Sequence, residues 1–529
     1  MRVFPVAAAF LLLQVVQAPA ALAAPDAPTY SSSVYKASGC PDVGCGGVGV
    51  EDTFVFSSSP EVVNYRWGFT DPPSNTVAAG TPVRWAPETG GPKTLYVEAV
   101  DGEGVPTRST FQFVVAAPMP NVASWFNGDD PAFDGTGNGH DLVVTGVDTA
   151  RAGRTVGGQG AIGFDGVASN GATTAKVLDT AQGFSVSAWV RLTDDTVSRT
   201  VISQQGAQES AFRLGFDAVS HKWTFALAER DAADARQRTA KSNARAAAGV
   251  WTHLTGTYES ASREVKLYVD GIAQERVASV RHGFAAEGEL WIGKALRGSA
   301  AAEAWHGDLA EVRAWNRIIA PQEVREMAGA SGVGEWKFNE GSGSFARDSS
   351  PYARDLVLAS GAKWGQGVQG AGGVELVGGT SAVSVNEPVL YTDQSFSVDV
   401  WAKLGEAGTA RTVLAQRGPS EVDPFTLRYD GEQWSAEMPD AAVNPSKWWR
   451  AKGTAVANKW THLVATYNAS TRTLTLAVGY QDSPVTVTGT VNRVAGWSST
   501  AGFSVGRGST GESFVGTVDE LKVLQGIAS

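Results

Sequence analysis

A nine-residue strand pattern that occurs twice is the feature that most constrains this chain. Phe184 to Leu192 reads FSVSAWVRL, and Phe396 to Leu404 reads FSVDVWAKL. In both copies apolar residues recur at period two, which predicts a β-strand with one buried face. A tryptophan occupies the same position in each copy, as Trp189 and Trp401. The chain therefore contains a unit that has been repeated.

The repeat extends far beyond this strand. Further segments match at an almost constant offset, namely Arg199–Val201 with Arg411–Val413, Phe212–Leu214 with Phe425–Leu427, Trp251–Leu254 with Trp460–Leu463, and Glu311 with Glu520. Each unit spans about 200 residues, which is too long for a solenoid repeat and has the size of one large β-sandwich. The sequence therefore predicts an all-β protein with tandem domains at residues 119–330 and 331–529.

Residues 1–24 have the features of a secretory signal peptide. Arg2 supplies a positive end, residues 6–16 form an apolar core, and residues 20–24 form a cleavage site of small residues. The apolar run is too short to span a bilayer, and no later segment is long and apolar enough to do so. We therefore expect a secreted, extracellular protein without membrane insertion.

The charge of the chain argues against one class of partner. The net charge is −11, and residues of both signs are interspersed along the sequence. A surface that follows nucleic-acid phosphates needs a basic field, and the sequence contains no long run of Lys and Arg. Nucleic acid is therefore not an expected partner.

The two cysteines of the chain, Cys40 and Cys45, lie close together in the segment CPDVGC. In an exported chain such a pair is predicted to close a small disulfide loop, helped by the turn residues Pro41 and Gly44. A metal site would need further ligands of this kind nearby, and the segment has none.

Residues 25–118 precede the repeats and have a different pattern. Short alternating runs occur at Thr53–Phe56, Val83–Trp85, Leu95–Val100 and Ser109–Val115, with turn sequences such as DPP and GGP between them. Their number and spacing predict a small immunoglobulin-like β-sandwich. We expect this domain to act as a spacer.

One helix and one hairpin are also predicted in the first repeat. Residues 321–328 begin with a proline, have early acidic residues and are followed by Gly329, which predicts a short helix. The run from Val265 ends in Asp270-Gly271, a dipeptide typical of a hairpin turn. The second repeat has no counterpart of the helical segment.

The ordered motifs resemble those of a known family. A Trp-containing first strand, the loop DGTGNG at 134–139, FSVSAW, WTHL, LYVDG and the strand from Gly307 occur in this order. This series resembles the tandem laminin G-like (LamG) domains of secreted bacterial proteins in the concanavalin A-like lectin/glucanase superfamily. The resemblance covers residues 119–529 and implies two jelly-roll sandwiches after the immunoglobulin-like domain.

The same resemblance implies a calcium site in each repeat, built from an acid in the early loop and acids in the last strand. Ca²⁺ takes six to eight oxygen ligands, which carboxylates and loop carbonyls can supply. The corresponding residues are Asp348, Asp519 and Glu520 in the second repeat and Asp134, Asp308 and Glu311 in the first. In the first repeat Ala310 replaces the strand aspartate. Alternatively, these acids cap turns and the domains fold without metal.

Catalysis is not expected, although the superfamily includes glycoside hydrolases. The acid strings of its glucanases, Glu-x-Asp-x-Glu and Glu-x-Asp-x-x-Glu, do not occur, and the nearest string is Glu229–Asp234. His253 and His462 are matched between the repeats, so we interpret them as buried or hydrogen-bonded structural residues. The matched Trp189, Trp251, Trp401 and Trp460 are interpreted as core residues for the same reason.

An unmatched aromatic segment is the candidate ligand site. Trp448, Trp449 and Arg450 have no counterpart in the first repeat. Such residues can stack on a sugar ring or hold an anionic group, although adjacent strand residues face opposite ways and one of them can be buried. Trp305 and Tyr352 are weaker candidates.

Two functional classes follow, with a third kept as less favoured. The first is an exported, non-catalytic binding protein that recognises carbohydrate or a cell-surface or extracellular protein, with calcium as the implied cofactor. The second is a structural adhesion or spacer module without a small ligand. The third is a glycoside hydrolase, because a fold does not determine a function.

Overall fold

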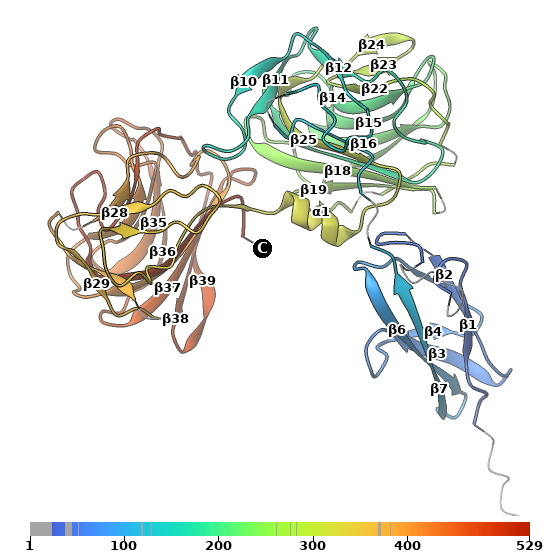
Figure 1. Cartoon of the computed structure of the whole chain (residues 1–529), viewed down its shortest axis with the longest axis horizontal. Coiled ribbons are helices and arrows are strands. Elements are labelled where there is room, and N and C mark those ends of the chain that lie inside the picture. The colour runs from blue at the N-terminus through green and yellow to red at the C-terminus, as the bar shows by residue number, and fades with distance from the viewer. Residues whose placement is uncertain are drawn as a thin grey trace, which may run out of the picture. The chain divides into compact units, whose positions relative to one another are not determined.

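The computed structural model describes residues 24–36, 45–50, 52–117, 120–128, 130–260, 262–275, 277–281, 283–368, 372–380 and 382–528 (Figure 1). The chain divides into two compact units, Met1–Pro118 and Met119–Ser529. Nearly all of the expected signal peptide and Cys40 lie outside the described residues, so the signal peptide and the disulfide stay predictions. No helix in the described ranges has the length and hydropathy required to cross a bilayer.

The first unit is a small sandwich of two antiparallel sheets, with the orders β1-β2-β5 and β4-β3-β6-β7. The strands are β1 (Thr29–Ser31), β2 (Asp52–Ser57), β3 (Val62–Gly68), β4 (Asn75–Ala78), β5 (Val83–Trp85), β6 (Gly91–Asp101) and β7 (Pro106–Val115). Phe54, Leu95 and Val97 are fully buried between the sheets. This arrangement agrees with the predicted immunoglobulin-like sandwich.

The first repeat, here called jelly roll 1, consists of two large sheets and a separate two-stranded sheet, β23-β24. Sheet I has the order β10-β11-β25-β13-β18-β19-β20, with β8 and β21 pairing at its side, and sheet II has the order β17-β16-β15-β14-β22-β12-β9. The bounds are β8 (Ala123–Trp125), β9 (Val143–Thr145), β10 (Asp148–Arg151), β11 (Ala161–Asp165), β12 (Asn170–Ala172), β13 (Phe184–Leu192), β14 (Arg199–Gln205), β15 (Ser210–Asp217), β16 (Lys222–Ala228), β17 (Gln237–Lys241), β18 (Trp251–Glu259), β19 (Glu264–Val269), β20 (Ile272–Ala273), β21 (Ala278–Ser279), β22 (Leu290–Ile292), β23 (Ala295–Arg297), β24 (Ala300–Ala302) and β25 (His306–Trp315).

The second repeat, jelly roll 2, has the same plan. Its sheet I has the order β29-β30-β41-β32-β37-β38-β39 with β26 beside β41, and its sheet II has the order β27-β28-β31-β40-β33-β34-β35-β36. The bounds are β26 (Ser331–Trp336), β27 (Phe345–Ala346), β28 (Leu356–Leu358), β29 (Ala362–Gly365), β30 (Gly373–Val377), β31 (Val383–Val385), β32 (Phe396–Leu404), β33 (Arg411–Gln416), β34 (Phe425–Tyr429), β35 (Gln433–Pro439), β36 (Trp448–Thr454), β37 (Trp460–Asn468), β38 (Thr473–Tyr480), β39 (Ser483–Asn492), β40 (Phe503–Val505) and β41 (Val515–Gln525).

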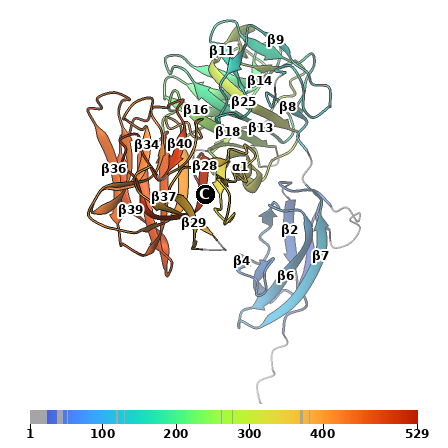
Figure 2. The ribbon, with the colours of Figure 1, turned by 60° about the vertical axis from the view of Figure 1, so that its left-hand side comes forward.

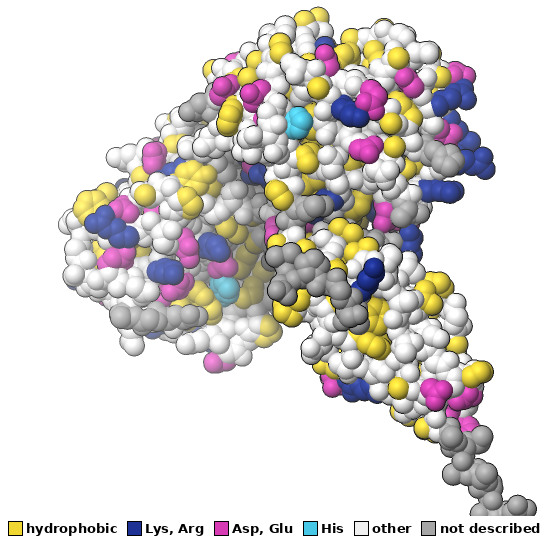
Figure 3. All heavy atoms as spheres, turned by 45° about the vertical axis from the view of Figure 1, so that its right-hand side comes forward, with side chains coloured by type: hydrophobic (Ala, Val, Ile, Leu, Met, Phe, Trp, Pro, Cys, Tyr) yellow, Lys and Arg dark blue, Asp and Glu magenta, His cyan; other side chains and the backbone are white. Residues whose placement is uncertain are grey.

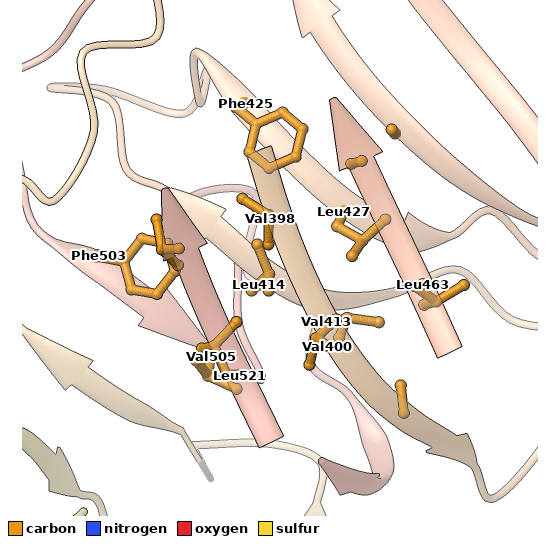
Figure 4. Packing of buried hydrophobic residues seen from close by; sticks show 14 of the residues in the cluster. Val398, Val400, Val413, Leu414, Phe425, Leu427, Leu463, Phe503, Val505 and Leu521 are labelled. Atoms are coloured by element: carbon orange, nitrogen blue, oxygen red, sulfur yellow. The ribbon is translucent and has the colours of Figure 1, made fainter. Parts of the chain in front are cut away.

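The core of each jelly roll lies between its two sheets. Figure 4 shows this for jelly roll 2, where Val398 and Val400 of β32 face Leu414 and Leu427 of sheet II. Period-two alternation places these side chains inward and their chain neighbours outward. The repeated strand found in the sequence is therefore central to sheet I, as β13 and β32, and the predicted all-β class is confirmed.

The predicted helix is confirmed as α1 (Pro321–Ala328). The carboxylate of Glu323 accepts a hydrogen bond from the backbone N–H of Ala320 (2.8 Å), which stabilises the first turn. Val324 of the helix packs with Tyr268 and Trp315 on the outer face of sheet I. Figures 1 and 2 show α1 beside the strands of this sheet, so the helix covers part of a face that would otherwise be exposed.

The interpretation of the matched tryptophans as core residues needs correction. Trp401 and Trp460 point away from the core of jelly roll 2 and are only half-buried. Trp189 and Trp251 are buried, but they form a small cluster with Ala161 and Ala310 that is separate from the main core. The repeat therefore preserves tryptophans on the outer face of sheet I, where burial depends on what covers that face.

Candidate ligand-binding faces

The outer face of sheet II in jelly roll 2 carries two of the three predicted ligand residues. Along β36, Trp449 and Ala451 point into the core, and Trp449 is 5% exposed. Trp448, Arg450 and Lys452 therefore point to the outer face, where Trp448 is half-buried and Arg450 is exposed. Adjacent residues of the strand thus separate a core tryptophan from a surface tryptophan.

Charged side chains hold this outer face in a defined arrangement. The guanidinium carbon of Arg450 lies 5.4 Å from the centre of the Trp448 ring. Its Nε is 3.2 Å from Oε1 of Glu437, a carboxylate whose side chain is 3% exposed. Nζ of Lys452 is 2.6 Å from Oδ2 of Asp430, which lies in the turn between β34 and β35. The arginine beside the tryptophan is therefore held by a buried carboxylate.

An arginine–glutamate ion pair also lies on this face, and the sequence pattern did not predict it. Nη2 of Arg428 is 2.5 Å from Oε2 of Glu512, which lies in the loop between β40 and β41. In jelly roll 1, Nη1 of Arg213 is 2.7 Å from Oε2 of Glu303 in the corresponding loop. The two glutamates each stand two residues before a buried aromatic residue, which was a usable signal. The two arginines come from positions offset by two in the repeat, which hid the pair.

In jelly roll 1 the outer face of sheet II is hollowed into a polar cavity of about 250 Å³. Its lining includes Arg199, Thr200, Arg213, Asp217, Lys241 and Glu303. Burial alone raises the pKa of Glu303, but Arg213, Thr200 and Arg297 outweigh it and the pKa is lowered. Burial likewise raises the pKa of Asp217, and Lys241 and Ser220 reverse the shift. The cavity therefore presents ionised acids and bases, a lining suited to hydroxyl-rich ligands.

The acids expected in the early loops act as turn caps. Asp134 accepts hydrogen bonds from the backbone N–H groups of Ser124 (3.0 Å) and Thr136 (3.0 Å), and its pKa is lowered although burial opposes the shift. Asp348 accepts backbone hydrogen bonds from Glu335 (2.9 Å) and Arg354 (2.8 Å) in the same way. Both carboxylates thus stabilise the loop on which they stand.

The acids of the last strand in jelly roll 1 are paired with arginines. Asp308 lies 2.7 Å from Arg151 and 2.7 Å from Arg191. Glu311 lies 2.6 Å from Arg154 and 3.2 Å from Arg313. Cations from the chain itself neutralise these carboxylates, so this set does not fit a calcium ion.

In jelly roll 2, Asp519 is fully buried and accepts hydrogen bonds from the backbone N–H groups of Val368 (2.8 Å) and Glu520 (2.9 Å). Glu520 and Glu311 occupy the same bulge of the last strand, with φ of 47° and 48°. Within the described ranges, no three His, Cys, Asp or Glu side chains form a group that could hold a metal ion. Calcium binding stays a prediction.

The two weaker ligand candidates and the matched histidines differ in burial and in their contacts. Trp305 is fully buried in the core of jelly roll 1, so its interpretation as a ligand residue is wrong. Tyr352 is half-buried, with the guanidinium of Arg354 lying 4.4 Å from its ring centre. The interpretation of the matched histidines is confirmed, since His253 is 1% exposed and Nε2 of His462 is 2.5 Å from Oδ1 of Asp399.

The fold and these faces define a class of protein with two tandem lectin-like sandwiches, each with a polar outer face on one sheet. Residues 165–325 and 377–528 match the family Laminin_G_3, described as the concanavalin A-like lectin/glucanases superfamily. The matched segments make up more than half of the chain, and the protein belongs to this family. No curated protein matches the sequence.

Several solved structures have a similar fold at low identity. Domain 4 of an extracellular arabinanase from Geobacillus stearothermophilus, solved with arabinotriose, is 18% identical over 40% of this chain and 98% of that one, with a TM-score of 0.31. Domains LG4-5 of the mouse laminin α1 chain are 14% identical over 71% and 90% of the two chains, with a TM-score of 0.24. The binding domain of botulinum neurotoxin serotype D is 7% identical over 69% and 87%, with a TM-score of 0.34.

Proposed function

We propose that the protein is an exported, non-catalytic binding protein that recognises carbohydrate through the outer faces of sheet II. The observation that carries this proposal is the half-buried Trp448, which stands beside Arg450 on a face of ion-paired acids and bases. Aromatic rings stack on the apolar faces of sugars, and fixed charged groups bond their hydroxyls. The polar cavity on the corresponding face of jelly roll 1 supports the same ligand class.

The acid string closest to a glucanase motif has structural partners. Oε1 of Glu229 is 2.6 Å from Arg238, and Oδ2 of Asp234 is 2.7 Å from Arg230. Asp231 accepts hydrogen bonds from the backbone N–H groups of Ala207 (2.6 Å) and Gln208 (2.8 Å). These contacts support binding rather than hydrolysis as the role of the protein.

A glycan-array screen of the full chain, carried out with Ca²⁺ and again with EDTA, tests the proposal. We expect bound glycans whose signal falls about tenfold in Trp448→Ala, because one stacking contact contributes on the order of 1 kcal/mol or more. Signals lost in EDTA would add calcium to the function.

Phe345→Ala is the matched control, because Phe345 lies on β27, at the opposite edge of sheet II from β36, is 43% exposed and has Arg347 5.4 Å from its ring centre. The control variant should keep full binding. An array without signal in either buffer would favour the adhesion or spacer role, and equal losses in both variants would remove Trp448 from the site.

A further inference from the structure

A guanidinium group occupies the outer face of sheet I in jelly roll 1. The guanidinium carbon of Arg154 lies 4.0 Å from the centre of the Trp189 ring. Nη2 of the same arginine is 2.6 Å from Oε1 of Glu311, and the side chain of Arg154 is 16% exposed. Arg313 approaches the other carboxylate oxygen of Glu311 at 3.2 Å. Tryptophan and glutamate together therefore form a binding site for one arginine side chain, which the chain itself provides.

Jelly roll 2 retains the tryptophan and the glutamate of this site. Trp401 pairs with Asp519 across the sheet at the register in which Trp189 pairs with Ala310, and the same bulge follows in both strands. Glu520 stands in that bulge with the left-handed backbone of Glu311. Trp401 is half-buried, whereas Trp189 is 8% exposed, and Glu520 is half-buried as Glu311 is. The site in jelly roll 2 is therefore built on the same backbone but is open to solvent.

The arginine is the part that jelly roll 2 lacks. Arg154 lies in the loop between β10 and β11, and the corresponding loop, residues 366–372, reads QGVQGAG without Arg or Lys. In the described part of jelly roll 2, no cation lies over the ring of Trp401 and no ion pair includes Glu520. His462 stacks on one side of Trp401, with ring centroids 4.7 Å apart and an interplanar angle of 5°.

Relative to jelly roll 1, the open site has gained carboxylates and has lost an arginine. Asp399 replaces Ser187, and Asp519 replaces Ala310, so two carboxylates are added at positions next to Trp401. Asp399 is 39% exposed and holds His462. Lys522 stands where jelly roll 1 has Arg313, the second partner of the bulge glutamate. Figure 3 shows acidic and basic side chains interspersed on the visible face of the molecule.

We propose that Trp401 and Glu520 form a binding site for an arginine side chain of a protein partner. Guanidinium is preferred over ammonium, because its flat, weakly hydrated group stacks on an indole ring while its N–H groups bond a carboxylate. The copy in jelly roll 1 shows this arrangement with Arg154. The site lies on sheet I, and the proposed carbohydrate face lies on sheet II. The two proposals can therefore be tested independently.

A titration with arginine amide, followed through the indole N–H signals of the ¹⁵N-labelled full chain, tests the proposal. The signal of Trp401, assigned with Trp401→Phe, should shift with arginine amide and not with citrulline amide, which has the same shape without the charge. Glu520→Gln should weaken the binding about tenfold, since the ion pair and the orientation of the stacked cation are both lost. Asn468→Ala, at the end of β37 in the same sheet, should leave it unchanged.

Two variants calibrate the measurement within the same chain. Arg154→Ala opens the counterpart in jelly roll 1, so arginine amide should then shift the Trp189 signal, which we expect not to respond in the natural protein. Gln366→Arg supplies a guanidinium in the loop of jelly roll 2 and should abolish the response of Trp401. A response of Trp189 without one of Trp401 would overturn the proposal and show that the open copy has lost the site.

The same titration separates other ligands. Equal shifts with citrulline amide, or an unchanged affinity in Glu520→Gln, would overturn the proposal. A shift of the Trp401 signal with Ca²⁺, without a response to arginine amide, would overturn it in favour of the calcium site implied by the family. Melting temperatures of the variants confirm that each one is folded.

Discussion

The two jelly rolls share a core and differ on the outer face of sheet I. The matched histidines show the difference most clearly, because His253 is 1% exposed, whereas the side chain of His462 is 21% exposed and pairs with Asp399. In jelly roll 1 the helix α1 and Arg154 cover this face, and jelly roll 2 has neither among its described residues. The duplication thus preserved the inside of the sandwich and left one outer face free to diverge.

The largest expected effect tests the shared core. Trp125 and Trp336 are both fully buried, and each indole N–H donates to a backbone carbonyl, that of His140 (2.7 Å) or Arg354 (3.0 Å). Replacing either tryptophan with alanine should lower the free energy of unfolding by about 3–5 kcal/mol, because a large cavity and a lost hydrogen bond result. Urea denaturation of the full chain measures both losses. A loss under about 1 kcal/mol in one copy would show that the cores are not equivalent.

The second prediction concerns the tryptophans of the outer face. Trp189 is 8% exposed and lies against Arg154, whereas Trp401 is half-buried. We expect Trp189→Ala to cost about 3 kcal/mol and Trp401→Ala about 1 kcal/mol, because the loss follows the buried area and the contacts removed. Calorimetry of the two variants measures the difference. Equal losses would mean that the outer face of jelly roll 2 is covered in solution.

The third prediction is a pH dependence that arises from His253 in the covered copy. Burial, with smaller contributions from Arg154 and Arg313, lowers the pKa of His253 from 6.5 to about 3. Below about pH 6.5 the unfolded chain binds a proton that the folded chain does not, so stability falls by about 1.4 kcal/mol per pH unit until about pH 3. At pH 5 the loss is about 2 kcal/mol.

Denaturation between pH 7 and pH 5 measures this loss. His253→Gln removes the titrating group and should flatten that part of the stability curve, and His462→Gln is the control at the matched position. A curve that keeps its slope in His253→Gln would assign the loss to other groups.

The matched strands made the fold predictable, but not the cover of sheet I. Period-two alternation identifies one buried face, and β32 has that pattern. Its counterpart β13 is buried on both faces, because α1 and Arg154 come from elsewhere in the chain. A matched tryptophan on an outward position therefore looked like a core residue in both copies.

The arginine partners of the last-strand acids could not be predicted from the sequence for the same reason. Arg154 and Glu311 are separated by 157 residues in the sequence and meet only through the sheet order. A sequence pattern shows that carboxylates recur in the last strand, but it does not show which cation satisfies them. The ligand face was easier to predict from the sequence, because strand alternation alone already places Trp448 and Trp449 on opposite faces of the sheet.

The smallest expected effect is the difference in stability loss between substitutions of the two bulge glutamates, Glu311 and Glu520. Glu311 is 27% exposed and pairs with two arginines, so Glu311→Gln should lower the free energy of unfolding by about 1 kcal/mol. Glu520 has no ion pair among the described residues, and Glu520→Gln should change the stability by less than about 0.5 kcal/mol.

Denaturation at low and at high salt measures both values, and the loss in Glu311→Gln should shrink as salt screens the pair. A loss of about 1 kcal/mol in Glu520→Gln would mean that a group of the chain already satisfies this carboxylate. The bulge would then serve folding in both copies. A neutral result leaves Glu520 as a left-handed backbone position that carries a charge without a folding role, which is the condition for binding a cation from outside the chain.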